Sequence, residues 1–91
     1  MNISHDQERS RFVTSTDHGE AVIEYRRDDQ AVDFTHTYVP PPARGRGIAE
    51  ALVRTALDWA EREKLHVQAS CWYVARYIET RRPSLRERPV S

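Results

Sequence analysis

The chain has little of several residue types on which particular functions depend. Cys71 is its single cysteine, so no disulfide can form within the chain, and a free thiol is typical of cytoplasmic proteins. Lys64 is its only lysine, which excludes a P-loop because that motif needs a Gly-Lys-Ser/Thr sequence. No apolar run is long enough to cross a bilayer, and residues 1–6 lack the apolar region of a secretion signal. We therefore expect a cytoplasmic protein that does not enter a membrane.

The chain also has no excess of charge of either sign. Fourteen basic and fourteen acidic residues balance at pH 7, whereas a protein that binds nucleic acid through its phosphates carries a strongly basic face. Four arginines between positions 81 and 88 are the basic cluster that could bind nucleic acid, but Glu79 and Glu87 dilute it. Nucleic acid is therefore not an expected partner, and any anion site must be local.

The length of 91 residues is that of one compact domain. We place this domain at residues 11–83 and expect flexible termini at residues 1–10 and 84–91. Strand-like alternation and helical periodicity then divide the domain into successive elements. The predicted elements are strands at 11–16, 21–26 and 31–39, a helix at 48–63, a strand at 65–71, and a helix from 72 or 73 to 80. This order predicts a mixed α/β (α+β) fold in which antiparallel strands lead into a parallel β-α-β unit.

The long helix has an apolar and a charged face. Its apolar residues recur at a spacing of four and predict the core side of the helix: Ile48, Leu52, Ala56 and Ala60, widened by Val53, Leu57 and Trp59. Its charged residues alternate in sign at the same spacing and predict a solvent-facing ladder of ion pairs: Glu50, Arg54, Asp58 and Arg62.

The strand before this helix ends at three prolines. Alternation along residues 31–39 predicts that Val32, Phe34, His36 and Tyr38 share one face of the strand. Because prolines cannot continue a hydrogen-bonded ladder, residues 40–42 predict an extended exit, followed by a loop at residues 43–47.

That loop contains the most informative motif in the sequence. Gly45 and Gly47 stand between the proline-terminated strand and the first turn of the long helix. The first N–H groups of a helix lack partners and lie at the positive end of its dipole, so this position suits a phosphate. A tight connection without a ligand is the alternative interpretation. A dinucleotide-binding loop is excluded, because the run ends in Ile48 and Ala49 with no third glycine.

The loop resembles the pyrophosphate loop of the GNAT acyltransferase superfamily, Arg/Gln-x-x-Gly-x-Gly/Ala, which likewise lies between a strand and a helix. Arg44, Gly47 and Ala49 match that pattern. With the segments 36–40 and 71–78, nearly the whole chain resembles the short GNAT-like proteins sometimes called YjdJ-type acetyltransferases. The resemblance implies a minimal GNAT fold, with a splayed sheet flanked by two helices. Tyr38 and Trp72 depart from the residues usual in that family, on the side where an acceptor would bind.

The resemblance also implies a cofactor, coenzyme A or acetyl-CoA, and the residues that hold it. Backbone groups near Tyr38 and Val39 would pair with the pantetheine arm between the splayed strands. The loop would hold the pyrophosphate. The implied cofactor-binding residues are Tyr38, Val39, Arg44, Gly45, Arg46, Gly47, Ile48 and Ala49, and no metal site is expected.

Two residues are the candidates for catalysis. Cys71 precedes a helix start, where the dipole favours a thiolate, and the alternative is a small apolar residue in the core. His36 can take a proton from an amine near neutral pH, and the alternative is a histidine packed on an apolar strand face. Tyr73 and Tyr77 could protonate a leaving thiolate, although such tyrosines more often pack against the sheet.

The resemblance, together with these residues, implies a small acetyl-CoA-dependent N-acetyltransferase. The alternative function is a CoA-binding or protein-interaction module with little turnover. The acceptor, an amine or a peptide, and the oligomeric state are left open by the sequence.

Overall fold

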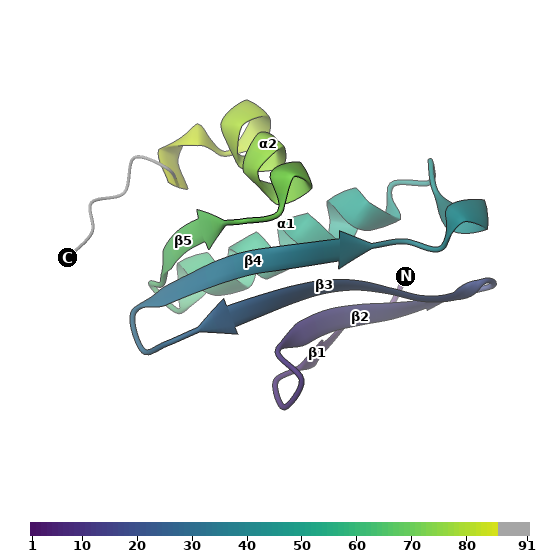
Figure 1. Cartoon of the computed structure of the whole chain (residues 1–91), viewed down its shortest axis with the longest axis horizontal. Helices are drawn as coiled ribbons and strands as arrows, with labels where there is room; N and C mark the ends of the chain where they lie inside the picture. Colours follow the sequence, from purple (N-terminus) through teal and green to yellow (C-terminus); the bar gives the residue numbers. More distant parts are fainter. Residues whose placement is uncertain (86–91) are drawn as a thin grey trace.

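The protein folds as one five-stranded sheet with two α-helices. The structure, a computed structural model, describes residues 1–85. Its elements in chain order are β1 (Ser4–Asp6), β2 (Arg11–Thr16), β3 (Gly19–Arg27), β4 (Ala31–Tyr38), the 3-10 helix η1 (Pro41–Ala43), α1 (Ile48–Arg62), β5 (His66–Ala69), α2 (Trp72–Arg81) and the 3-10 helix η2 (Pro83–Leu85). The strands lie in the order β1-β2-β3-β4-β5, antiparallel except for the parallel pair β4 and β5 (Figure 1). The predicted mixed fold with a parallel β-α-β unit is confirmed.

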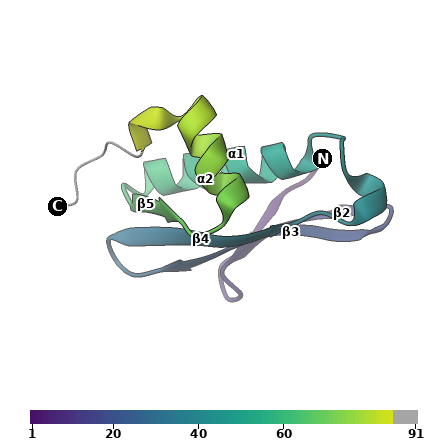
Figure 2. The same ribbon diagram turned by 45° about the horizontal axis from the view of Figure 1, so that its top comes forward.

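The two helices lie on one side of the sheet. Helix α1 runs along one face and contacts β2, β3 and β4, while α2 contacts β4 and β5 at the edge (Figure 1). Figure 2 shows the opposite face of β2, β3 and β4 without a covering helix. None of the helices in residues 1–85 is long and apolar enough to cross a membrane. One face of the sheet is therefore packed, and the other is open to solvent.

The core lies between α1 and the packed face. The apolar stripe of α1 is buried as its spacing predicts, with Leu52, Val53, Ala56 and Leu57 fully inaccessible. These side chains meet Ile23, Phe34 and other sheet residues in one continuous cluster. Burial of a side chain such as Leu57 contributes about 1.5–3 kcal/mol, so a domain of this size depends on α1 for its stability.

The charged face of α1 does not form the predicted ladder of ion pairs. Instead, Arg81 Nη1 lies 2.9 Å from Glu50 Oε1, and Arg82 bonds both Asp58, at 3.0 Å, and Glu61. Two of the four arginines in the C-terminal basic cluster therefore join α2 to α1. The other two, at positions 86 and 88, lie outside the described residues.

Both termini contain residues that the sequence assigned to flexible segments. Ser4–Asp6 forms β1 and pairs with β2, because the His5 ring stacks on Phe12 at 4.0 Å and meets Trp59 edge-on at 4.9 Å. At the other end, Leu85 is 2% exposed and joins the core. Residues 4–6 are therefore paired in the sheet and Leu85 is buried, although both lie in termini that were expected to be flexible, and residues 86–91 lie outside the described residues.

We expect His5 to make stability depend on pH. Its Nε2 lies 2.7 Å from the Tyr25 hydroxyl, and burial, with Arg27 nearby, lowers the pKa of His5 below its ordinary 6.5. The unfolded chain therefore binds a proton more readily, so the contribution of His5 is complete above pH 6.5 and is lost as the pH falls below it. Thermal unfolding should show a melting temperature several degrees lower at pH 5.5 than at pH 7.5.

A matched pair of variants tests whether His5 causes this slope, the change of melting temperature with pH. His5→Gln should flatten it, while His18→Gln, at the exposed β2–β3 turn, should leave it intact. An unchanged slope in His5→Gln would show that other groups control the pH dependence.

The exit from β4 also differs from the sequence prediction. Pro40 is still extended, with φ −51° and ψ 134°, but the expected extended exit ends there because Pro41–Ala43 forms the 3-10 helix η1. Ala43 N–H donates to Pro40 O at 2.8 Å, and Arg44 N–H donates to Pro41 O at 3.2 Å. Prolines are tolerated in a first helical turn because their missing N–H groups would have no helical partner there. The turn carries the chain away from the sheet toward the start of α1.

Candidate functional site

The site begins at a β-bulge in β4. Along the β3–β4 ladder, Glu24 pairs with His36, but the next residue, Tyr25, pairs with Phe34. Thr35 is therefore an extra residue on β4, and its hydroxyl donates to Glu24 O at 3.4 Å. A bulge bends its strand and increases the local twist. The predicted separation of β4 from β5 begins at the same point, because the last residue pair between the two strands is Phe34 and Ala69.

The bulge also changes which side chains share a face. Cross-strand partners lie on the same side of a sheet, so His36 and Tyr38 lie with Glu24 and Val22, on the face opposite the buried Ile23. His36 is exposed and Tyr38 is 42% exposed, whereas Phe34 is fully buried. The prediction that His36 and Tyr38 share a face with Phe34 is therefore wrong, and so is the alternative of a packed His36.

A polar clamp fixes the place where β4 and β5 separate. The Asp33 carboxylate accepts hydrogen bonds from both the Ser70 N–H, at 2.8 Å, and the Ser70 hydroxyl, at 2.7 Å. The next N–H, of Cys71, donates to Phe34 O at 3.0 Å. Beyond this pair of anchors the second half of β4, residues 35–38, has no β5 partner.

The separated strands enclose a cleft with a volume of about 870 Å³. Its walls come from three parts of the chain: residues 35–39 at the end of β4, the loop and first turn of α1, and the junction of β5 with α2. The lining residues are Thr35, His36, Thr37, Tyr38, Val39, Ala43, Arg44, Gly45, Gly47, Ile48, Ala49, Glu50, Ser70, Cys71, Trp72 and Tyr73. All the residues singled out by the sequence except Arg46 and Tyr77 therefore meet at one cleft.

The glycine loop forms the end of the cleft at α1. Gly45 and Gly47 have φ values of 82° and 80°, a conformation that other residues adopt only with strain. Gly47 is the N-cap of α1 and supplies no side-chain hydrogen bond, so the first helical N–H groups have no side-chain cap. A Cβ atom at either glycine would meet nothing within 4 Å. The space beside these donors is open, as a bound anion requires.

The two arginines of the loop have different positions. Arg44 lines the cleft and donates its Nε–H to Val39 O at 2.9 Å, which ties the loop to the end of β4. Its two Nη groups are not used by that bond and suit a phosphate. Arg46 is exposed and does not line the cleft, so it is the one predicted cofactor-binding residue that lies outside the cleft.

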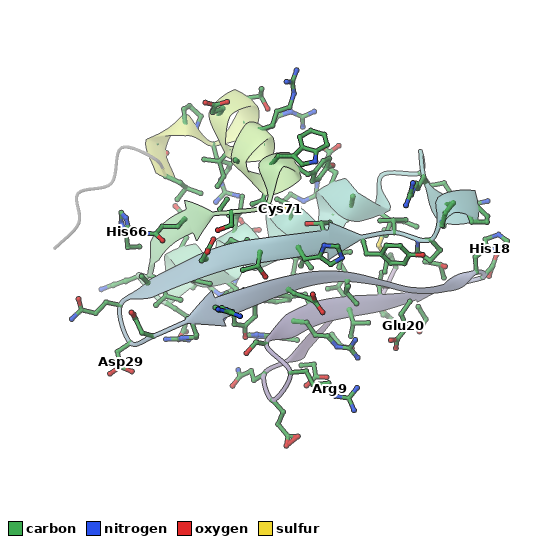
Figure 3. The ribbon with its side chains drawn as sticks, in the orientation of Figure 1. Arg9, His18, Glu20, Asp29, His66 and Cys71 are labelled. Carbon is green, nitrogen blue, oxygen red and sulfur yellow. The ribbon has the colours of Figure 1, made fainter. Side chains whose placement is uncertain are left out.

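Cys71 lies at the junction of β5 and α2, next to β4 (Figure 3). It is half-buried, it is the N-cap of α2, and its Sγ lies 3.7 Å from the Thr37 hydroxyl. Thr37 pairs with the buried Ile23 and so faces α1, unlike its neighbour His36. The two predicted catalytic residues therefore reach the cleft from opposite sides of β4. His18 and His66 lie at the two ends of the molecule, far from Cys71 (Figure 3).

Tyr73 and Glu50 complete the α1 side of the cleft. Tyr73 is half-buried, and burial, followed by the nearby Glu50 carboxylate and Tyr77, raises the pKa of its hydroxyl above the ordinary value. Tyr73 therefore keeps its proton at neutral pH. Arg81 pairs with Glu50 and lies 5.7 Å from the Tyr77 ring, which leaves Tyr77 outside the cleft.

Sequence reasoning missed Glu50, because it treated the residue as part of a solvent face. The available signal was its position in the first turn of the helix that follows the glycine loop. It also missed the Asp33–Ser70 clamp, since the two residues are 37 positions apart and no motif joins them. Among the described residues, no group of three His, Cys, Asp or Glu side chains could hold a metal ion.

Comparison with known proteins gives a consistent result. The model of the family described as GCN5-related N-acetyl-transferase matches residues 11–87. The chicken (Gallus gallus) Protein NATD1 is 37% identical over 82 residues, which cover 87% of this chain and 74% of the chicken protein. The human protein of the same name is also 37% identical and has 73% of its length covered, and the zebrafish (Danio rerio) protein is 34% identical with 74% covered. Each comparison includes the glycine loop and the two strands that separate.

Proposed function

Because this chain belongs to the GCN5-related N-acetyltransferase family, we propose that it is a small acetyl-CoA-dependent N-acetyltransferase that transfers an acetyl group to an amine. The single observation that carries the proposal is the cleft between β4 and β5. One end of this cleft is formed by the N-terminus of α1, which has no side-chain cap. A pyrophosphate fits the uncapped N–H groups at this end. A chain of amides such as pantetheine fits the edge of residues 35–38 that has no β5 partner.

In this proposal, different residues of the cleft bind different parts of the cofactor. The pyrophosphate is held by the loop end, with the backbone of Gly45, Gly47, Ile48 and Ala49 and the guanidinium of Arg44. Arg46 contacts the phosphates only from the solvent side, since it does not line the cleft. The backbone of Tyr38 and Val39 pairs with pantetheine. Glu50 does not repel the pyrophosphate strongly, because Arg81 neutralises its carboxylate.

The reaction requires two proton transfers on opposite sides of β4. When the amine nitrogen attacks the thioester carbonyl carbon, a C–N bond forms, the C–S bond breaks, and sulfur leaves as a thiolate. His36, on the open face, takes the proton that the amine loses. Tyr73, on the α1 side, gives its proton to the thiolate, as its raised pKa allows. The open face therefore admits the amine, and the packed face receives the leaving group.

Cys71 is the remaining candidate, on the same side as the leaving group. Its thiol contacts Thr37 across the cleft and lies where the acetyl group would be held. An acetyl-Cys71 intermediate is a second route to the same product. The accumulation of acetylated Cys71 in the mass spectrum of the protein with acetyl-CoA alone would favour that route.

Isothermal titration with acetyl-CoA and assays of acetyl transfer test the proposal together. We expect binding at sub-millimolar concentration, multiple turnovers with at least one amine, and loss of most turnover in His36→Ala, whereas the same loss in Cys71→Ala would favour the acetyl-Cys71 route. Folding is monitored by circular dichroism for each variant. Binding without transfer to any amine would support the alternative, a CoA-binding module, and no binding by the folded protein would exclude both.

A further inference from the structure

Two aromatic residues that line the cleft are more exposed than aromatic residues usually are. Among the described residues the exposed large apolar side chains are Trp72, at 74%, Tyr38, at 42%, and the chain-terminal Met1. Trp72 and Tyr38 both line the cleft, one on the α2 wall and one on the β4 wall. We call these two residues the aromatic pair. Exposed rings that gather at one concave site mark a binding surface.

The packing of α2 explains why Trp72 is free to bind. Val74 and Ile78 are the core residues of the helix, and Tyr73 lies toward Glu50 of α1. Trp72 lies on the remaining, outward side and touches only Tyr73 among the aromatic rings, with centroids 6.1 Å apart. Its indole therefore does little for the core and leaves most of its surface available.

Tyr38 has two separable roles in the cleft. Its backbone belongs to the part of β4 that has no β5 partner, to which we assign pantetheine. Its side chain lies on the open face with His36, because its cross-strand partner is Val22. The ring is therefore on the side from which the amine arrives, not on the side of the leaving thiolate.

The charges of the cleft restrict what can bind there. Apart from His36, the lining residues with a charged side chain are Arg44 and Glu50. Glu50 is already paired with Arg81, and Arg44 lies at the phosphate end. No unpaired carboxylate lines the mouth, so a second cationic group of an acceptor would have no partner there.

We propose that the acceptor is an aromatic monoamine, an amine attached by a short linker to a flat ring, which packs on Trp72 in the cleft that Tyr38 also lines. This inference rests on the proposed function. The ring of the acceptor stacks against the Trp72 indole. Its ammonium group first loses one proton to solvent, and the free amine then loses a second proton to His36 as it attacks the thioester. Polyamines and lysine-rich peptides, which carry several positive charges, are poor acceptors because the mouth offers no carboxylate for the additional charges.

Steady-state kinetics with the purified chain and acetyl-CoA test the inference. 2-Phenylethylamine and tryptamine are compared with spermidine and a lysine-containing peptide, and the aromatic amines should have the higher kcat/KM. Trp72→Ala should raise the KM for the aromatic amines about five- to tenfold and leave the Kd for CoA unchanged. Trp72→Phe should recover most of the loss. Arg76→Ala is the matched control, because Arg76 is exposed one turn further along α2 and does not line the cleft.

Two outcomes would overturn the inference. Higher kcat/KM for spermidine or the peptide would exclude an aromatic acceptor, and weaker CoA binding in Trp72→Ala with an unchanged amine KM would assign the indole to the adenine of the cofactor. Saturation-transfer NMR of 2-phenylethylamine with the CoA-loaded protein separates this inference from the proposed function. Binding that is lost in Trp72→Ala would support the aromatic site even if no transfer occurs, and no binding at millimolar amine would exclude it.

Discussion

Replacing Gly47 with alanine is expected to weaken acetyl-CoA binding at least about tenfold. Gly47 has φ = 80° and is the N-cap of α1, and an L-residue in this conformation costs about 1–2 kcal/mol. The strain can be relieved only if the first turn of α1 moves, which misplaces the N–H groups that would hold the pyrophosphate. Each hydrogen bond to a charged group contributes about 1.5–3 kcal/mol, and 1.4 kcal/mol is tenfold in Kd. Isothermal titration with acetyl-CoA measures the change.

Gly19→Ala is the control that separates binding from stability. Gly19 has φ = 113° and lies at the β2–β3 turn, outside the cleft. Its replacement should therefore cost a similar amount in the free energy of urea-induced unfolding but leave the Kd for acetyl-CoA unchanged. If both variants lost affinity equally, the loop would matter only for folding. If neither lost affinity, the anion would not bind at the start of α1.

Much of the fold could be predicted because its determinants are local in the sequence. The apolar stripe of α1 recurs every four residues, and the glycine loop lies immediately before it, so both the helix and its open N-terminus follow from short-range patterns. The parallel pairing of β4 and β5 follows from the helix between them. The family, confirmed by comparison, was recognisable from the same loop in the same order of elements.

The faces of β4 could not be predicted, because a bulge leaves no local signature in residues 31–38. A single extra residue, Thr35, reverses the alternation and exposes His36 and Tyr38. Its position depends on the register with β3 and on the clamp between Asp33 and Ser70, which are long-range contacts. The same limit applied to Glu50, whose partner Arg81 comes from α2, 31 residues away. Local patterns therefore predicted the strands, the helix and the glycine loop, the family resemblance implied that they form a cleft, and neither showed how the side chains face it.

We expect Tyr73→Phe to lower kcat about a hundredfold or more, because a positioned general acid contributes about 10²–10⁴ to the rate. The phenyl ring keeps the packing of Tyr73 against Trp72 and removes only the hydroxyl. The Kd for acetyl-CoA and the KM for the amine should stay close to those of the unchanged protein. Single-turnover transfer from acetyl-CoA measures the chemical step directly.

Tyr77→Phe is the matched control for this prediction. Tyr77 lies one turn further along α2 and is half-buried like Tyr73, but its ring is covered by Arg81 and it does not line the cleft. Its hydroxyl should therefore be dispensable for transfer. The raised pKa of Tyr73 adds a second requirement, since a group that holds its proton beyond the ordinary tyrosine range cannot produce a loss of rate between pH 7 and pH 9. A basic limb in this range that disappears in Tyr73→Phe, or an undiminished kcat in that variant, would mean that the leaving thiolate takes its proton from another donor.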